Sequence, residues 1–99
     1  MDVEVQARHV TVEPEVRALI DERLAMLADR YRELLRVHVT LRREGRHQRG
    51  ADEVDVVANV RGTTLRAAKR REHMLDAVHA ALDALERELV GWHERRTGT

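Results

Sequence analysis

The sequence predicts an α+β domain, β-α-β-β-β-α in order, with two helices packed on one face of a four-stranded mixed sheet. Three short segments alternate apolar and polar residues, as half-buried strands do, and a turn leads to a short fourth strand. Two longer segments repeat apolar residues at helical spacing. The length of 99 residues suits one domain with a single two-layer core, and no internal repeat or low-complexity linker divides the chain.

The first strand and the first helix occupy the opening third of the chain. Val3, Val5 and Ala7 alternate with polar residues, which is the period of a strand. Pro14 suits the first position of a helix, and acidic neighbours favour the positive end of the helix dipole. A helix is therefore expected over about residues 14 to 33. Its apolar face consists of Val16, Ile20, Leu24, Leu27, Tyr31 and Leu34.

Three further strands follow in close succession. Alternation from Val37 to Leu41 predicts the second strand, and alternation from Val54 to Val60 predicts the third. Residues 43–50 between them are polar and contain two glycines, which is typical of a loop. A turn at residues 61–63 leads to a short fourth strand, expected around residues 64–68. The short connections predict an antiparallel meander.

A second long helix completes the domain. We expect the domain to span residues 1–94 and residues 95–99 to form a frayed tail. The crossover through the first helix should be right-handed, which makes the first two strands parallel neighbours. The apolar face of the second helix consists of Met74, Val78, Ala81, Leu82, Leu85, Leu89 and Trp92.

The residues that enzymes and metal sites require are scarce. The chain has no cysteine or serine, and its glycines do not form a phosphate-binding loop. The six histidines are not at metal-ligand spacing; His73 and His79, for example, face different directions on a helix. We therefore expect no enzyme, no metal, no cofactor and no small-molecule substrate. The chain shows neither a signal peptide nor an apolar run of about 20 residues, so we expect a cytoplasmic protein without membrane contact.

Charge distribution, rather than net charge, carries the functional information. Eighteen basic residues balance eighteen acidic ones, and every basic residue except Lys69 is arginine. A GC-rich genome would explain this bias, and arginine also suits phosphate contacts. The arginines either gather into a cationic surface or pair with acids as a charge-balanced one. The sheet face opposite the helices is expected to carry Arg8, Arg36, His38, Arg42 and Arg66. The loop adds Arg43, Arg46 and Arg49.

Several local runs, in matching order and spacing, resemble one protein family along essentially the whole chain. That family is the ribosome hibernation-promoting factors, also called the ribosome-associated inhibitor or sigma 54 modulation protein family. The resemblance implies binding of the small ribosomal subunit (16S rRNA) near the decoding region, where the domain would block mRNA and tRNA sites and inhibit translation. The residues that carry it are Val3, Val5, His9-Val10, Val16-Arg17, Leu24-Ala25, Leu27, Tyr31, Val37-His38-Val39, Leu41, Met74, Ala77-Val78, Asp83, Leu85, Arg87 and Leu89.

The resemblance and the local basic clusters together give a set of RNA-binding candidates. The family usually carries basic residues beside the apolar faces of both helices, and this chain departs from that pattern on both. On the second helix only Arg95 fits directly among Ala77, Ala84, Glu88, Gly91 and Arg95. Met26 stands where a lysine is common, and Glu88 has the wrong sign for phosphate. The candidates are Arg23, Arg30, Arg66, Lys69, Arg70, Arg71, Arg87, Arg95 and Arg96.

Two other interpretations remain open from the sequence. The neutral net charge, Ala84 and Glu88 favour a diverged interaction module of the same fold that no longer binds ribosomes. Such a module could form a homodimer through the outer sheet face or the edge of the fourth strand. The chain could also be the N-terminal part of a longer hibernation factor.

Overall fold

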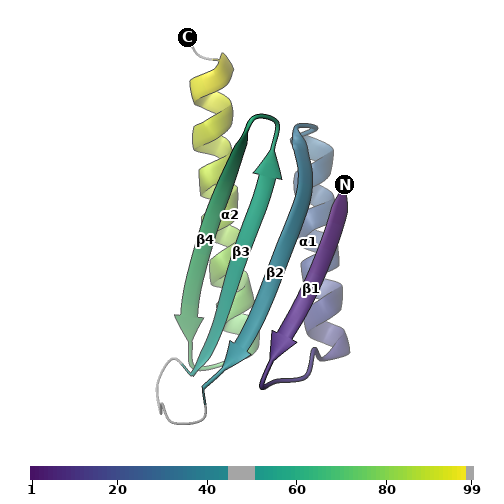
Figure 1. Ribbon diagram of the computed structural model, residues 1–99, viewed down its shortest axis with the longest axis vertical. Coiled ribbons are helices and arrows are strands. Elements are labelled where there is room, and N and C mark those ends of the chain that lie inside the picture. Colours follow the sequence, from purple (N-terminus) through teal and green to yellow (C-terminus); the bar gives the residue numbers. More distant parts are fainter. Residues whose placement is uncertain (45–50, 98–99) are drawn as a thin grey trace.

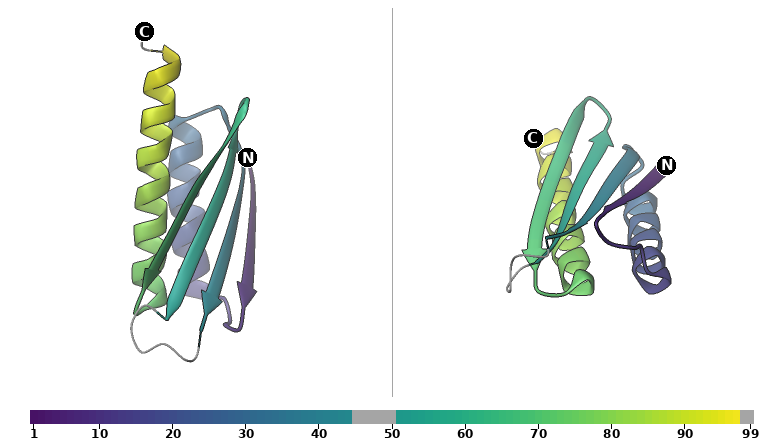
Figure 2. Two further views of the ribbon diagram at one scale, coloured as in Figure 1. Left: turned by 60° about the vertical axis from the view of Figure 1, so that its left-hand side comes forward. Right: turned by 60° about the horizontal axis from the view of Figure 1, so that its bottom comes forward.

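Two helices lie side by side against one face of a four-stranded sheet, and the other face is open (Figures 1 and 2). The structure is a computed structural model that describes residues 1–44 and 51–97. The α+β class and the element order predicted from the sequence are confirmed. The elements are β1 (Asp2–Arg8), α1 (Pro14–Arg30), β2 (Leu34–Arg43), β3 (Asp52–Val60), β4 (Thr63–Arg71) and α2 (Met74–Thr97).

The sheet follows the order β1-β2-β3-β4, so β1 and β4 form its edges. β1 pairs with β2 in parallel, whereas β2–β3 and β3–β4 are antiparallel, as predicted. The turn between β3 and β4 requires glycine at position 62, because Gly62 has a φ of +86° that a Cβ atom disfavours. His9, directly after β1, also has a positive φ of 60°, a conformation in which histidine is tolerated better than most residues.

The core between the sheet and the helices is almost wholly aliphatic. The predicted apolar faces of both helices and the alternating residues of β2 and β3 meet there. Tyr31 and Trp92 are its aromatic residues, each 7% exposed. The largest side chains that are fully buried are Ile20, Leu24, Leu41, Leu82, Leu85, Leu89, Val37, Val39, Val54, Val56 and Val78.

α1 ends three residues earlier than the sequence predicted, at Arg30 rather than residue 33. Tyr31 has an extended backbone, with a φ of −119° and a ψ of 93°. Its side chain is buried, and its ring meets the ring of His93 edge-on at 5.5 Å between centroids. Leu34 then begins β2 and remains in the core. Tyr31 and Leu34 are core residues that lie outside the helix. Because they keep the helical spacing of apolar residues, the sequence predicted a helix that is too long.

Other elements are longer than the sequence predicted. β2 runs from Leu34 to Arg43, a residue that the sequence placed in the following loop. β4 reaches Arg71 because β3 pairs with it along its whole length, as far as Asp52 opposite Arg71. α2 continues to Thr97, beyond the predicted domain end at residue 94. Arg96 stabilises this last turn by lying over the Trp92 ring, with its guanidinium carbon 5.0 Å from the ring centroid.

Candidate RNA-binding surface

Arg23 and Arg30 project from one side of α1 toward α2, and each meets an acid there. Arg23 Nη2 lies 2.8 Å from Asp83 Oδ1 and 3.5 Å from Glu86 Oε1. Its Nη1 also donates to the carbonyl oxygen of His79 at 3.4 Å. Arg30 Nη1 lies 3.5 Å from Glu86 Oε2. These four charged side chains, Arg23, Arg30, Asp83 and Glu86, form what we call the helix seam, in which both candidate arginines are neutralised.

The surface around the helix seam is shallow and chemically mixed. A hollow of about 50 Å³ is lined by both arginines of the seam, Glu86, Leu27 and Met26, whose side chain is 62% exposed. A wider one of about 360 Å³ is lined by both acids of the seam, Arg87 and Val90. Exposed methionine and two carboxylates do not favour a polyanion, so the seam is not a ready-made phosphate site.

The four candidate cations of β4 are divided between two faces of the sheet. Arg66 and Arg70 lie on the open face, whereas Lys69 and Arg71 lie on the side that the helices cover. Arg70 Nη2 is 3.6 Å from Glu53 Oε2, and Arg71 Nη1 donates to the Arg70 carbonyl at 2.7 Å. The expected cluster is therefore close in sequence but presents its charges in opposite directions around the sheet edge.

The three candidates of α2 differ in what they contact. Arg96 lies over Trp92 and donates to the carbonyl oxygen of Arg61 at 3.4 Å, so it holds the last turn of the helix to the β3–β4 turn. Arg87 and Arg95 are exposed, and within the described ranges neither makes an ion pair or hydrogen bond. These two side chains are available to a partner.

The open face of the sheet is largely charge-balanced. This agrees with the interpretation in which the arginines pair with acids rather than gather into a cationic surface. Arginines and a histidine of β2 stand beside acids of the two strands that flank it. This face therefore has little net charge to offer. The pairs are Arg36–Asp2 at 4.0 Å, His38–Glu4 at 3.1 Å and Arg42–Asp55 at 3.5 Å.

Arg43 has a structural role that the sequence reasoning missed. Its Nε and Nη2 donate to the two carboxylate oxygens of Asp52 at 2.8 and 3.1 Å. The Asp52 residue is only 3% exposed. This hydrogen bonding, together with the negative charge of Asp52, raises the pKa of the Arg43 guanidinium. Asp52 is two residues before Val54 in the alternating strand, so it points to the same helix side as Val54 and Val56. This spacing could have revealed Asp52 as a buried acid. Arg46 and Arg49, which the sequence placed in the same loop as Arg43, lie outside the described residues.

The candidate residues thus fall into two groups. Arg23, Arg30 and Arg70 are ion-paired, and Arg71 and Arg96 are held by other contacts. The second group, which we call the free cations, makes no hydrogen bond, ion pair or ring contact in the part of the chain that the structure describes. The free cations are Arg66, Lys69, Arg87 and Arg95.

The described residues contain no other built site. No three histidine, aspartate or glutamate side chains among them gather closely enough to hold a metal ion. Of the helices within those residues, neither is both long and apolar enough to cross a bilayer.

Fold and surface together define a small α+β domain whose chemistry lies in exposed and paired charges around a four-stranded sheet. The chain belongs to the family described as sigma 54 modulation protein / S30EA ribosomal protein, which it matches over residues 3–97. The resemblance seen in the sequence is therefore confirmed at the level of the family. No curated protein matches the chain.

Two solved structures share the fold. A ribosomal subunit interface protein from Coxiella burnetii superposes with a TM-score of 0.79 at 20% identity, over 94% of this chain and 98% of its own. The N-terminal domain of Protein Y from Thermus thermophilus gives a TM-score of 0.74 at 21% identity, over 89% of this chain and 94% of its own. At such identities the likeness establishes the architecture.

Proposed function

We propose that the protein is a ribosome hibernation factor that binds the small ribosomal subunit near the decoding region and blocks the mRNA and tRNA sites. The observation that carries this proposal is the family match, which runs from residue 3 to residue 97. Because the family is described as one of ribosomal proteins, it supports ribosome association as the general function of the chain. Inhibition of translation, contact with 16S rRNA and a role in dormancy under stress or in stationary phase are the finer proposals.

Steric occupation is the proposed mechanism, since it needs no catalytic group. The domain measures 46 × 22 × 17 Å along its principal axes. A rigid body of this size, held in a channel that messenger or transfer RNA must enter, excludes them without chemistry. The aliphatic core supplies the rigidity, and surface cations supply the attachment to phosphates.

We propose that the free cations make the first contacts with RNA. Lys69, on the edge strand β4, lies on the side of the sheet that the helices cover, and Arg87 and Arg95 lie on α2, which packs against that side (Figure 1). Arg66, also on β4, lies on the open face, so it meets RNA from the other side of the sheet. None of them has to leave a partner in the described structure before it meets a phosphate. The arginines of the helix seam can follow only by exchanging Asp83 and Glu86 for phosphate, so their contribution is expected to be smaller.

Cosedimentation with purified small and large subunits tests this proposal. We expect binding to small subunits at low and moderate salt, with concomitant loss of protein synthesis in a reconstituted system. Reversing two free cations of the helix side (Lys69→Glu with Arg95→Glu) should weaken binding strongly, while Arg17→Glu, at an exposed position of α1, should not. No association with small subunits at either salt would overturn the proposal.

A second candidate function is an interaction module that kept the fold without the ribosome. The helix seam favours it, because there Asp83 and Glu86 pair with the two candidate arginines of α1 and leave them little positive charge for RNA. The two functions differ in their partner. A folded protein that associates with other proteins but never with ribosomal subunits would establish the module.

A further inference from the structure

β1 is an open edge of the sheet, bonded to β2 alone (Figure 1). The outward side of an edge strand presents unpaired N–H and C=O groups, which can pair with another strand. Val3, Val5 and Ala7 are only half-buried on the helix side, in contrast to the fully buried residues of β2 and β3. The strand is thus incomplete both in backbone pairing and in apolar cover.

The charges of β1 are complementary to those of a second β1 strand that runs antiparallel to it. In an antiparallel pairing centred on Val5, Asp2 stands opposite Arg8 of the partner subunit, and Glu4 stands opposite the partner's Gln6. Val3 stands opposite the partner's Ala7 on the helix side. Directly opposite side chains on one sheet face lie about 4.5–5.5 Å apart, close enough to interact. Each contact occurs twice because the pairing is symmetric.

Both charged ends of the strand are available for this pairing. Arg8 makes no ion pair with any residue the structure describes. Asp2 is 81% exposed and lies 4.0 Å from Arg36, a distant pair at the surface. Neither side chain has to give up a close partner.

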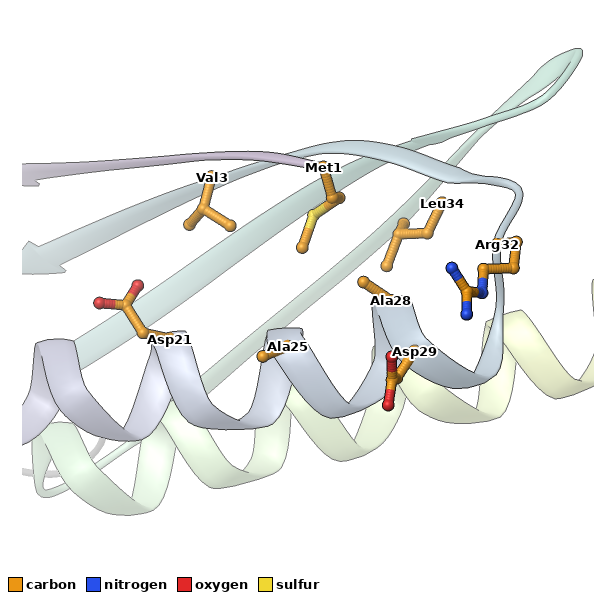
Figure 3. Close-up of a pocket in the computed structure, with 8 residues that line it drawn as sticks. All are labelled: Met1, Val3, Asp21, Ala25, Ala28, Asp29, Arg32 and Leu34. Carbon is orange, nitrogen blue, oxygen red and sulfur yellow. The ribbon is translucent and has the colours of Figure 1, made fainter.

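A groove beside β1 supplies further surface that a second copy would cover. It is an open hollow of about 490 Å³ between the strand and α1, lined by apolar Met1, Val3, Ala25, Ala28 and Leu34 and by charged Asp21, Asp29 and Arg32 (Figure 3). Met1 is 47% exposed. A strand added beyond β1 would place its own helix-side residues next to the apolar part of this lining.

The opposite edge of the sheet does not have this complementarity. β4 carries Arg66, Lys69, Arg70 and Arg71 and no acid. Antiparallel self-pairing would bring cations together, and edge cations are a common protection against such pairing. The open sheet face, where Arg42 pairs with Asp55 and Arg70 with Glu53, is no better suited. The sequence had suggested the β4 edge and the outer sheet face as homodimer contacts. Both are therefore less suitable for self-association than the β1 edge.

We propose that the partner of the β1 edge is a second copy of this chain, joined by antiparallel β1–β1 pairing about a twofold axis at Val5. The result is a closed dimer with one continuous eight-stranded sheet, since a twofold contact uses the same surface on both subunits. This proposal does not depend on ribosome binding.

Sedimentation equilibrium over a range of protein concentrations tests the dimer through a charge swap. Asp2→Arg and Arg8→Asp each place two like-charged pairs across the interface and should weaken dimerisation about tenfold. The double variant Asp2→Arg with Arg8→Asp restores opposite charges and should return the dimerisation constant to within about threefold of the wild type. Glu94→Arg on α2 and Arg61→Asp in the β3–β4 turn are matched controls that should dimerise like the wild type.

Two results would overturn the proposal. The first is a wild-type protein that stays monomeric up to about 1 mM, a concentration that would detect even a weak dimer. The second is a dimer that the single substitutions leave unchanged or that the double substitution fails to restore, because it would then use another surface. Circular dichroism of each variant verifies that the substitutions leave the fold intact.

Discussion

The layer between the sheet and the helices contrasts with the surface that surrounds it. In the layer, aliphatic side chains such as Ile20, Leu41 and Leu85 are fully buried, and they come from every element except the two edge strands. On the surface, arginines and acids alternate, and many stand within ion-pair distance of each other. Burial is concentrated in one place, whereas charge is spread over all sides.

This difference separates stability from function. Burial of one large aliphatic side chain contributes about 1.5–3 kcal/mol. An exposed ion pair contributes only about 0–1 kcal/mol. Surface charges can therefore change sign or position during evolution with little effect on the fold. The fold kept a TM-score of 0.79 to a relative at 20% identity, which agrees with this division.

The largest effect is expected in the centre of the buried layer. Leu85→Ala should lower the free energy of unfolding by about 2–5 kcal/mol, because it leaves a cavity beneath α2. Urea unfolding measures the change. Leu35→Ala, at a side chain that is 48% exposed, is the matched control and should cost far less. Equal costs at the two positions would mean that the buried layer does not dominate stability.

Arg43 is the surface charge expected to behave most like a core residue. Arg43→Ala would leave the buried Asp52 carboxylate without its two hydrogen bonds, which should cost about 1–3 kcal/mol. Arg42→Ala, on the neighbouring residue, removes an ion pair of the open face and should cost less than about 1 kcal/mol. Thermal or urea unfolding of both variants would show whether burial of the partner decides the cost.

The smallest change in stability is expected at the helix seam, where binding should instead improve. Glu86→Gln removes the acid that Arg23 and Arg30 share, which frees positive charge at little cost to the fold. Affinity for small subunits should rise a few-fold at low salt. Glu22→Gln changes the net charge equally on an exposed part of α1. An equal gain from that control would mean that the seam has no special role.

Sequence patterns predicted the architecture because the spacing of apolar residues along the chain shows which face of each helix or strand is buried. Three alternating strands, two helical faces and short connections were sufficient for the element order and the parallel pairing of β1 with β2. Boundaries were less accurate at Tyr31 and Arg71. There, core packing or cross-strand pairing, rather than local period, decides where an element ends.

The candidate surface was less predictable because ion pairing joins residues distant in sequence. Arg23 and Glu86 are 63 residues apart, and no local pattern of either helix reveals that they meet. Strand alternation did indicate that Arg66 and Lys69 face opposite ways, so their separation could have been foreseen. The sequence predicted which residues are basic and exposed, but only the folded structure separates neutralised arginines from the free cations.

The salt dependence of binding to small ribosomal subunits tests the central claim most directly. Each free cation that contacts a phosphate should contribute about one unit to the slope of log K against log salt. Lys69→Ala and Arg95→Ala should therefore each lower the slope by about one while leaving the thermal midpoint unchanged, and Arg17→Ala should leave both unchanged. Slopes for Lys69→Ala and Arg95→Ala equal to that of the wild type would contradict a ribosome contact made by the free cations.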